Sequence, residues 1–240
     1  MIINLISGPR NISTALMYAF AQRSDTRVID EPFYAYYLHK TGAVHPGRKE
    51  ILQSMSVDYE EVIEDICSKE KDSEILFVKN MAHHLIMNNR QFLTGWHNVF
   101  LIRDPGQLLT SFVKVIPNPG LGDIGLKKSW ELYQELGQNS IVIDSNEILK
   151  SPRKMLTKLC VDIGIPMQSA MLQWEAGARP EDGVWASYWY ANVHKSTGFG
   201  LPNKKNEALP DHLTQVYEEA LKYYNQLYQN SIRNVAGVSS

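Results

Sequence analysis

Apolar residues along the chain are gathered in five short runs, each rich in β-branched side chains. A compact, mostly apolar run of this length is typical of a strand that is buried on both faces, as in a parallel sheet. The five expected strands cover residues 2–6, 27–29, 75–78, 99–102 and 141–143. The pattern therefore predicts a central parallel sheet of about five strands.

Between these runs, apolar residues recur every three or four positions, which is the spacing of one face of an α-helix. The clearest stripe covers residues 155–163. It follows Ser151-Pro152, a cap and a first-turn proline, and it stops before Gly164. Further stripes cover residues 12–20, 62–66, 108–112 and 213–228. Because helical patterns alternate with strands, we expect an α/β fold with helices on both faces of the sheet.

No clean period survives over residues 174–209, where glycine, proline and aromatic residues are mixed with charges, and we interpret this segment as active-site loops. The chain has 240 residues, 44% of them hydrophobic, which is enough for one buried core. We therefore expect a single domain over residues 1–233 and a flexible C-terminal tail at 234–240. No apolar run approaches the roughly 18 residues that span a bilayer, so neither a membrane anchor nor a signal peptide is expected.

The charge composition of the chain argues against nucleic acid as a binding partner. The formal net charge is −2, the pI is about 6.4 and no Lys/Arg tract occurs, so nucleic acid is not an expected partner. An anionic ligand would need a local site. The two cysteines, Cys67 and Cys160, are too few for a disulfide framework. We expect both to pack as small apolar residues in a protein of the reducing cytoplasm.

Polar residues follow each of the five expected strands. In open parallel sheets, ligands bind beyond the carboxyl ends of the strands, where loops and helix N-termini converge. The residue pairs at this edge are Ser7-Gly8, Asp30-Glu31, Lys79-Asn80, Arg103-Asp104 and Asp144-Ser145. Since polar residues end most strands, the pattern locates the edge without naming its ligand.

The loop after the first strand has the features of an anion site. Ser7-Gly8-Pro9-Arg10-Asn11-Ile12-Ser13-Thr14 leads into a helix whose first turn holds two hydroxyls. The backbone N–H groups and the helix dipole favour an anion there, and Arg10 adds a charged donor. The segment is not a Walker loop, because it has one glycine and no lysine. The alternative is a capped turn with a solvent-facing Arg10.

A second pair of anion-binding side chains follows the fourth strand. Arg103 leaves the sheet at its ligand edge, and Ser111 comes eight residues later, about two helical turns further on. Together the two side chains are spaced to grip a phosphate. The alternative is a local ion pair between Arg103 and Asp104, with Ser111 as an ordinary helix residue.

Three separated segments together resemble the sulfotransferase superfamily, whose sulfuryl donor is 3'-phosphoadenosine 5'-phosphosulfate (PAPS). Residues 7–14 resemble the loop that binds the 5'-phosphosulfate, and residues 99–111 resemble the 3'-phosphate motif with its Arg-to-Ser interval. Residues 143–166 are similar to a segment after a late strand in many members, and residues 223–228 add a weaker match. The resemblance implies a P-loop-like, three-layer α/β/α sandwich that needs no metal. The donor would be held by Gly8, Pro9, Arg10, Asn11, Ile12, Ser13, Thr14, Arg103 and Ser111, with Arg10 also stabilising charge on the transferred group.

The resemblance also implies a general base that takes the proton of the acceptor. Several branches of the family use a glutamate near the second strand, and Glu31 stands there, followed by a proline that fixes its setting. Asp30 is the fallback, and a helix-capping role for Glu31 is the structural alternative. His83 and His84 follow Lys79, but the position of the histidine base in other branches is Met81 here. We expect the two histidines to orient the acceptor or to stabilise charge, or else to pack.

A second departure from the family lies near the C-terminus, where cytosolic members carry Arg-Lys-Gly. In its place this chain has Lys195, Ser196 and Thr197, followed by a glycine. These three residues are expected to close over the donor, or to form a surface turn. Nearby aromatic residues would stack on adenine, line the acceptor pocket or belong to the core: Trp185, Tyr188, Trp189 and Tyr190.

The sequence thus predicts a PAPS-dependent sulfotransferase that acts on a hydroxyl or amine of a small-molecule acceptor. A nucleotide or metabolite kinase with a variant phosphate loop is one alternative, and a non-catalytic nucleotide-binding protein is another. The identity of the acceptor and the oligomeric state cannot be read from the sequence.

Overall fold

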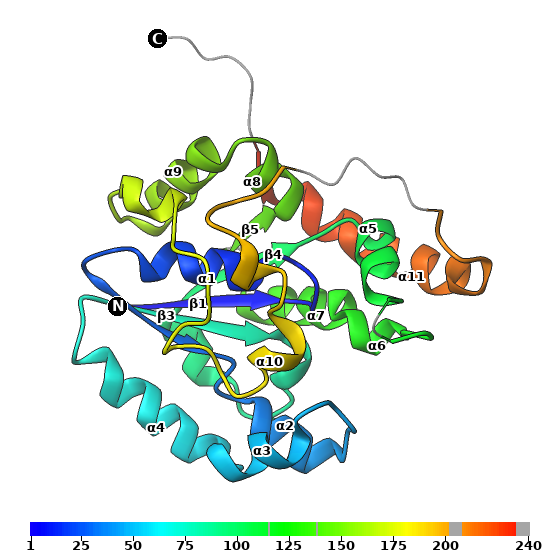
Figure 1. Cartoon of the computed structure of the whole chain (residues 1–240), viewed down its shortest axis with the longest axis horizontal. Helices are drawn as coiled ribbons and strands as arrows, with labels where there is room; N and C mark the ends of the chain where they lie inside the picture. Colours follow the sequence, from blue (N-terminus) through cyan, green and yellow to red (C-terminus); the bar gives the residue numbers. More distant parts are fainter. Residues whose placement is uncertain (115, 138, 202–207, 234–240) are drawn as a thin grey trace.

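The computed structural model describes residues 1–114, 116–137, 139–201 and 208–233; the tail expected at 234–240 lies outside these ranges. At its centre is a parallel sheet with the strand order β2-β3-β1-β4-β5-β6 (Figure 1). The strands are β1 (Ile2–Ser7), β2 (Thr26–Asp30), β3 (Ile75–Met81), β4 (His97–Ile102), β5 (Ile141–Asp144) and β6 (Ser231–Ile232). All five strands expected from the sequence are present. The two-residue β6 is too short to leave a sequence pattern.

Helices cover both faces of this sheet, as the alternating pattern predicts. The α-helices are α1 (Ser13–Ala21), α2 (Tyr34–Thr41), α3 (Arg48–Ser54), α4 (Tyr59–Glu70), α5 (Pro105–Phe112), α6 (Leu121–Ile124), α7 (Leu126–Leu136), α8 (Ser145–Lys150), α9 (Pro152–Ile163), α10 (Ala186–Trp189) and α11 (Thr214–Gln229). Short 3-10 turns are η1 (Ala82–His84), η2 (Gln91–Gly95), η3 (Ser169–Leu172), η4 (Val193–Lys195) and η5 (Asp211–Leu213). No helix in the described ranges is both long and apolar enough to cross a membrane.

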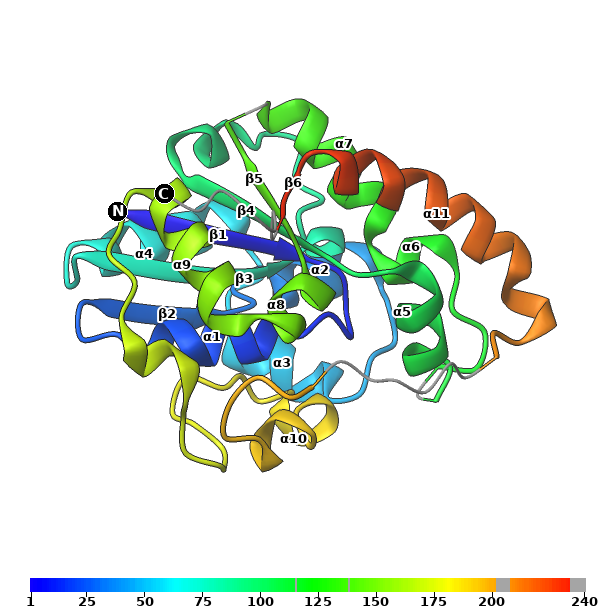
Figure 2. The ribbon, with the colours of Figure 1, turned by 90° about the horizontal axis from the view of Figure 1, so that it is seen from above.

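The side chains of β1 alternate between two hydrophobic cores, because successive residues of a strand point to opposite faces. Ile3 and Leu5 pack with apolar residues of α1 and α9, whereas Ile2 and Ile6 pack with residues of α4, α5, α7 and α11. Figures 1 and 2 show α1 and α9 on one side of the sheet and α4 and α7 on the other. The three-layer α/β/α sandwich predicted from the sequence is therefore confirmed.

A buried ladder of asparagines crosses the middle of the sheet. The side-chain amide of Asn80 in β3 donates to Asn4 Oδ1 in β1 at 2.8 Å, and Asn4 Nδ2 donates to Asn98 Oδ1 in β4 at 2.8 Å. Asn98 Nδ2 continues the ladder to the carbonyl oxygen of Leu93 at 2.8 Å. Each of the three amides gains a partner within the ladder, which offsets most of the cost of burying them, although Asn80 Oδ1 has no partner in the described chain.

A third, smaller core joins the segment at 174–209 to the second helix of the chain. Tyr34 and Leu38 of α2 pack with Trp185, Ala186 and Tyr190 around α10. Residues 185–190 of the segment that shows no period in the sequence are therefore anchored beside the carboxyl ends of β2 and β3, and residues 202–207 lie outside the described ranges. This anchoring places Tyr190 within reach of the residues that follow those strands.

One packing prediction is wrong. Cys160 is buried in α9, as expected, but Cys67 is exposed on α4. Ile66 is the residue of that turn that faces the core. Its neighbour Cys67 is rotated by about 100° around the helix, and that rotation carries the thiol to the surface.

Candidate active site

The carboxyl ends of the central strands open into a cavity of about 570 Å³. Most of the predicted site residues line it: Pro9, Arg10, Asn11, Ile12, Ser13, Thr14, Glu31, His83, His84, Arg103, Ser111 and Ser196. Gly8, Lys195 and Thr197 are outside the lining. The chain thus brings two predicted anion-binding segments and the predicted base to one cavity, which is of a size typical for ligand sites.

The loop before α1 holds its backbone in an uncommon conformation. Arg10 and Ile12 have φ angles of 59° and 50°, in the left-handed region that non-glycine residues rarely adopt. Ile12 is the N-cap of α1 and supplies no side-chain hydrogen bond to the first turn. The first N–H groups of α1 are therefore not capped by that side chain, and together with the helix dipole they favour an anion.

Gly8 has a packing role. A Cβ atom at this position would lie only 2.2 Å from the carbonyl oxygen of Ile124, at the junction of α6 and α7. A glycine is therefore needed for the loop to pass this backbone. Gly8 packs against the backbone of Ile124 and does not line the cavity.

The two predicted anion-binding segments are joined by hydrogen bonds. Arg103 Nη1 donates to the backbone carbonyl oxygen of Arg10 at 2.7 Å, and Arg10 Nε donates to Ser111 Oγ at 3.2 Å. The alternative hypothesis, an ion pair between Arg103 and Asp104, is not supported. The Asp104 carboxylate instead caps α5 by accepting a hydrogen bond from the N–H of Gln107 at 3.0 Å.

The two arginines lie close together and are partly buried. Burial lowers the pKa of the Arg10 guanidinium, and burial followed by the nearby positive charge of Arg10 lowers the pKa of Arg103. Arg103 Nε is buried without a hydrogen-bond partner in the described part of the chain, as is Asn11 Oδ1. Two cations that share a desolvated wall are stabilised by an anion, so this wall suits a phosphate.

At the same cavity, a lysine and two carboxylates form a buried cluster. Lys79, the fifth residue of β3, is fully buried and its Nζ donates to Asp30 Oδ1 at 2.8 Å and to Glu31 Oε1 at 2.5 Å. A third bond from Nζ goes to the hydroxyl of Tyr190 at 2.8 Å. Burial alone would lower the pKa of Lys79, but Asp30 and Glu31 outweigh it and raise that pKa. The lysine is therefore charged and its three donors are used.

Glu31 is held in strain beside this lysine. Its φ angle is 41°, and with Arg10 and Ile12 it completes the set of non-glycine residues with positive φ in the described chain. All three line the cavity, which is where strained backbone is expected at a functional site. Burial raises the pKa of Glu31, Lys79 opposes the rise and the charge of Asp30 adds to it. The helix-capping alternative does not hold: the side chain bonds to Lys79, and only the backbone carbonyl of Glu31 contacts the following turn, at Tyr34 N–H.

The two histidines lie next to Glu31 in an aromatic wall. His84 is sandwiched between Tyr34 and Tyr37 with ring centroids 4.4 and 4.8 Å away, and its Nδ1 lies 3.8 Å from Glu31 Oε2. Burial lowers the pKa of His83 to about 3 and that of His84 well below its ordinary value. Both imidazoles are therefore neutral at pH 7. Their Nδ1 atoms are buried with no hydrogen-bond partner in the described chain.

The C-terminal residues predicted to close over the donor behave differently from one another. Lys195 and Thr197 are exposed, and only Ser196 of the three lines the cavity. The Ser196 hydroxyl is already engaged, since it donates to the carbonyl oxygen of Val193 at 2.7 Å and accepts from Trp174 Nε1 at 3.1 Å. Of the nearby aromatic residues, Trp189 and Tyr190 line the cavity, whereas Trp185 is buried and Tyr188 is exposed.

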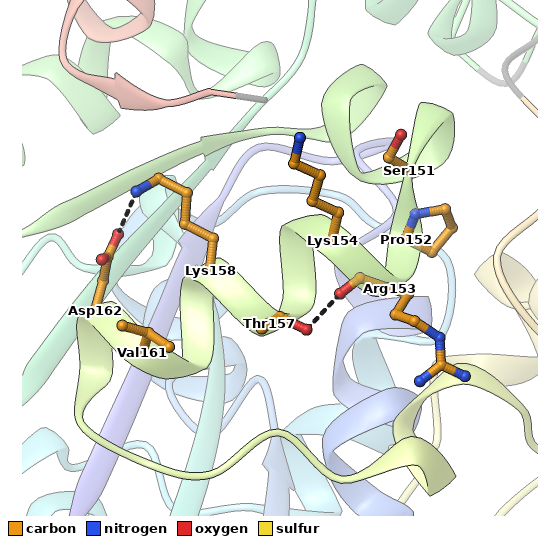
Figure 3. A pocket seen from close by; sticks show the side chains of 8 residues that line it. All are labelled: Ser151, Pro152, Arg153, Lys154, Thr157, Lys158, Val161 and Asp162. Carbon is orange, nitrogen blue, oxygen red and sulfur yellow. Dashed lines mark hydrogen bonds and ion pairs between the residues drawn. The ribbon is translucent and has the colours of Figure 1, made fainter. Parts of the chain in front are cut away.

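A second hollow lies on the outer face of α9 and has none of these properties (Figure 3). Its side chains stand on one exposed helix, and Lys158 pairs with Asp162 at 3.8 Å on the same helix. The charged side chains that line it are all exposed: Arg153, Lys154, Lys158 and Asp162. In the described ranges, no group of three or more His, Cys, Asp and Glu side chains is placed to hold a metal ion.

Comparison with known proteins identifies the class. A family model described as a sulfotransferase domain matches residues 1–230, and the chain belongs to this family. Branched-chain-amino-acid aminotransferase-like proteins 2 and 1 of Arabidopsis thaliana are 38% and 39% identical over 230 residues, which is 94% of this chain and 41% of each relative. The chain spans about two fifths of the length of these relatives, and the name they carry describes the whole proteins.

Solved structures of similar fold are also sulfotransferases. The sulfotransferase domain of the Synechococcus PCC 7002 olefin synthase has a TM-score of 0.57 and 16% identity, covering 91% of this chain and 93% of that one. A domain from the curacin biosynthetic pathway has a TM-score of 0.53 and 15% identity, covering 97% and 98%. Mouse sulfotransferase SULT7A1, solved with PAP, has a TM-score of 0.52 and 13% identity, covering 97% and 84%. At this identity the likeness shows the fold.

Proposed function

We propose that residues 1–233 form one catalytic domain, which transfers a sulfuryl group from PAPS to a hydroxyl or amine of a small-molecule acceptor. The observation that carries the proposal is the placement of Arg10, Arg103 and Glu31 around one cavity. Two guanidinium groups and the N-terminus of α1 suit a doubly phosphorylated donor, and a carboxylate of raised pKa suits proton removal.

The donor would lie across the ends of β1 and β4. Ser13, Thr14 and the N–H groups of α1 would hold its 5' end, and Arg103 with Ser111 would hold the 3'-phosphate. Arg10 lies between the two, because its carbonyl is bound by Arg103 and its guanidinium by Ser111. On donor binding, the Arg10 side chain would be positioned to stabilise charge that develops on the transferred group and on the bridging oxygen.

The transfer is a single in-line displacement. A lone pair of the acceptor oxygen or nitrogen forms a bond to sulfur while the bond from sulfur to the 5'-phosphate oxygen breaks. The proton of the acceptor passes to a carboxylate oxygen of Glu31 and is then released to water. The products are the sulfated acceptor and 3'-phosphoadenosine 5'-phosphate (PAP). Most of the acceleration in such a step comes from position and from charge stabilisation.

The geometry favours Glu31 over the two other candidates for the base. Both oxygens of Asp30 are engaged, Oδ1 by Lys79 and Oδ2 by the hydroxyl of Tyr190 at 2.7 Å. The histidines have strongly lowered pKa values and are weak bases. We assign them to the acceptor side, where their unpartnered Nδ1 atoms would bond to the acceptor.

Ligand binding separates this proposal from its rivals. We expect PAP to raise the Tm of the protein, and Mg-ATP to leave it unchanged, since a bound ligand stabilises the folded state. A kinase with a variant loop would show the reverse, together with ATP-dependent turnover. If neither PAP nor Mg-ATP raises the Tm, the donor assignment is wrong.

A matched pair of variants then tests the base. Glu31→Gln should abolish transfer of labelled sulfate from PAPS to a panel of alcohols and amines, and PAP should bind it as tightly as it binds the wild type. Glu64→Gln, on the exposed face of α4, is the control and should keep full activity. A wild type that binds PAP but sulfates no acceptor in the panel would favour a non-catalytic binding protein.

A further inference from the structure

Tyr190 links the segment at 174–209 to the buried charges beside the proposed base. It follows α10, is 5% exposed and packs with Tyr34 and Trp185. Its hydroxyl reaches Asp30 Oδ2 at 2.7 Å and Lys79 Nζ at 2.8 Å, partners that are 160 and 111 residues away in sequence. Burying a phenol this deeply is favourable only when its hydroxyl is bonded, and here it is bonded to charge.

The hydrogen-bonding capacity of this hydroxyl is used completely. A phenol has one proton to donate and two lone pairs. Lys79 Nζ and, at 3.1 Å, Trp185 Nε1 donate to the lone pairs. The single proton is therefore left for Asp30 Oδ2 at 2.7 Å, since the other acceptor within reach, Glu31 Oε1, is 3.4 Å away.

The same count fixes the orientation of Glu31. The three protons of the Lys79 ammonium go to Asp30, Tyr190 and Glu31. The bonds to Asp30 and Tyr190 fix the direction of the third N–H bond, and this bond holds Glu31 Oε1. Oε1 of Glu31 is bound to Lys79, and Oε2 lies on the side of His84. Without the Tyr190 hydroxyl, one ammonium proton and one Asp30 oxygen would lose their partner, and Lys79 would be held by two hydrogen bonds instead of three.

We propose that Tyr190 is a positioning residue for Glu31: its hydroxyl ties Lys79 to Asp30, and the tied pair holds the glutamate with one carboxylate oxygen toward the acceptor. The proposal rests on the proposed function, in which Glu31 is the base. Tyr190 acts through its neighbours and need not touch the acceptor.

Several titratable groups surround the Glu31 carboxylate. They come from every element packed against it: Asp30 at the end of β2, Tyr34 of α2, Lys79 of β3, His84 of η1 and Tyr190. Burial raises the pKa of Glu31, Lys79 lowers it and the charge of Asp30 raises it. Without the Tyr190 hydroxyl, Asp30 loses the donor that offsets its charge and Lys79 loses one of its three acceptors, so the pKa of Glu31 should rise further.

Tyr190→Phe is the direct test, with Tyr188→Phe as its matched control in the preceding helix α10, where the tyrosine is 49% exposed. In Tyr190→Phe we expect kcat to fall about tenfold or more at neutral pH while KM for PAPS changes less than about twofold, because the donor site is untouched. The acid limb of the kcat profile should move to higher pH. Tyr188→Phe should match the wild type in all three measurements.

A second readout needs no turnover. The carboxyl carbons of labelled glutamates are titrated by NMR in the donor-free protein, with Glu31→Gln to assign the Glu31 signal. Tyr190→Phe should raise the titration midpoint of Glu31 while the PAP dissociation constant stays the same. If the wild type shows no sulfuryl transfer, the proposed function fails, and this midpoint alone decides the role of Tyr190.

An unchanged midpoint in a folded Tyr190→Phe protein would overturn the proposal, as would an equal change in Tyr188→Phe. Should Tyr190→Phe fail to fold, Trp185→Phe removes one of the two donors to the same hydroxyl and leaves Tyr190 in place. A less polarised hydroxyl donates more weakly to Asp30, so the midpoint should rise by a smaller amount. No rise in a folded Trp185→Phe would count against the network.

Discussion

Arg103 Nη1 donates a 2.7 Å hydrogen bond to the backbone carbonyl oxygen of Arg10, joining the end of β4 to the loop after β1 across 93 residues of sequence. Arg10 in turn donates to Ser111, on the helix that follows β4. The two segments that resemble opposite ends of a donor site are therefore one hydrogen-bonded unit. A change at Arg103 should be felt at both ends of the donor.

Arg103→Ala should weaken PAP binding by roughly 10- to 100-fold, because it removes a charge-assisted hydrogen bond worth about 1.5–3 kcal/mol and also the support of the Arg10 carbonyl. Isothermal titration calorimetry measures the loss. Arg103→Lys keeps the positive charge but loses the forked donor geometry of the guanidinium, so its affinity for PAP should lie between those of the wild type and Arg103→Ala. Arg153→Ala, on the outer face of α9, is the control. Equal PAP affinity in Arg103→Ala and the wild type would contradict the donor assignment.

The left-handed backbone at Ile12 makes an unusual prediction for stability. At a φ of 50°, a residue with a Cβ atom carries a strain of about 1–2 kcal/mol. Isoleucine and alanine both carry this strain at position 12, and glycine does not. Both Ile12→Gly and Ile12→Ala lose the packing of the isoleucine against the core of α1. We therefore expect Ile12→Gly to be the more stable of the two by about 1 kcal/mol, the reverse of the usual order. Urea unfolding compares them, and a more stable alanine variant would show that the loop relaxes.

The fold could be predicted because its signals are local. Strands β1, β3, β4 and β5 are mostly apolar and buried, and polar residues follow them at the sheet edge. The cap and proline before α9 are equally local, at Ser151 and Pro152. The two-residue β6 carries no such signal, because its place in the sheet is set by pairing with β5.

The candidate site could be predicted only in part, for a related physical reason. Glu31 and Arg103 follow strands directly, so the sequence places them at the ligand edge, and the structure brings them to one cavity. Their roles remain predictions. Tyr190 joins the cluster through contacts more than 100 residues away, which no local pattern contains. Lys195 and Thr197 are exposed, which agrees with the surface-turn alternative, and their contact with a donor remains a prediction.

The buried histidines predict a loss of stability in acid. The pKa of His83 is lowered to about 3 and that of His84 well below its ordinary value, mainly by burial, so below pH 6.5 the unfolded chain binds protons that the folded chain does not. Stability then rises with pH in this window and is lost as the pH falls from 6.5 toward 3. For each of the two histidines, the free energy of unfolding should fall by about 1 kcal/mol as the pH is lowered from 7 to 5.5.

His84→Phe tests this dependence while keeping an aromatic ring between Tyr34 and Tyr37. The free energy of unfolding, measured in urea at pH 7 and at pH 5.5, should differ by about 1 kcal/mol less in the variant than in the wild type. The same substitution at the exposed His39 is the control. An identical pH dependence in His84→Phe and the wild type would show that His84 is not kept neutral by burial.

Asp182 fastens the segment at 174–209 to the sandwich. Its carboxylate, 4% exposed, accepts from the hydroxyl of Tyr18 in α1 at 2.7 Å, contacts His194 Nε2 at 2.9 Å and accepts from the N–H of Arg179 at 2.9 Å. The next residue, Gly183, donates from its backbone to Asp30 at 3.3 Å. One carboxylate thus fixes the wall of the cavity that carries Tyr190 and Ser196.

Asp182→Ala should loosen this wall, because the Tyr18 hydroxyl, the Arg179 N–H and His194 Nε2, all partly buried, lose their common partner, at a cost of about 1–3 kcal/mol. Trypsin should then cut after the exposed Lys195, which is followed by Ser196, faster than in the wild type, and PAP should bind more weakly. Glu181→Ala removes a neighbouring exposed carboxylate and serves as the control. If the segment closes over the donor, PAP should slow the cleavage of Asp182→Ala, since binding would restore the order that the substitution removes. Cleavage at the wild-type rate would mean that the hydrophobic contacts of Trp185 and Tyr190 alone hold the wall in place.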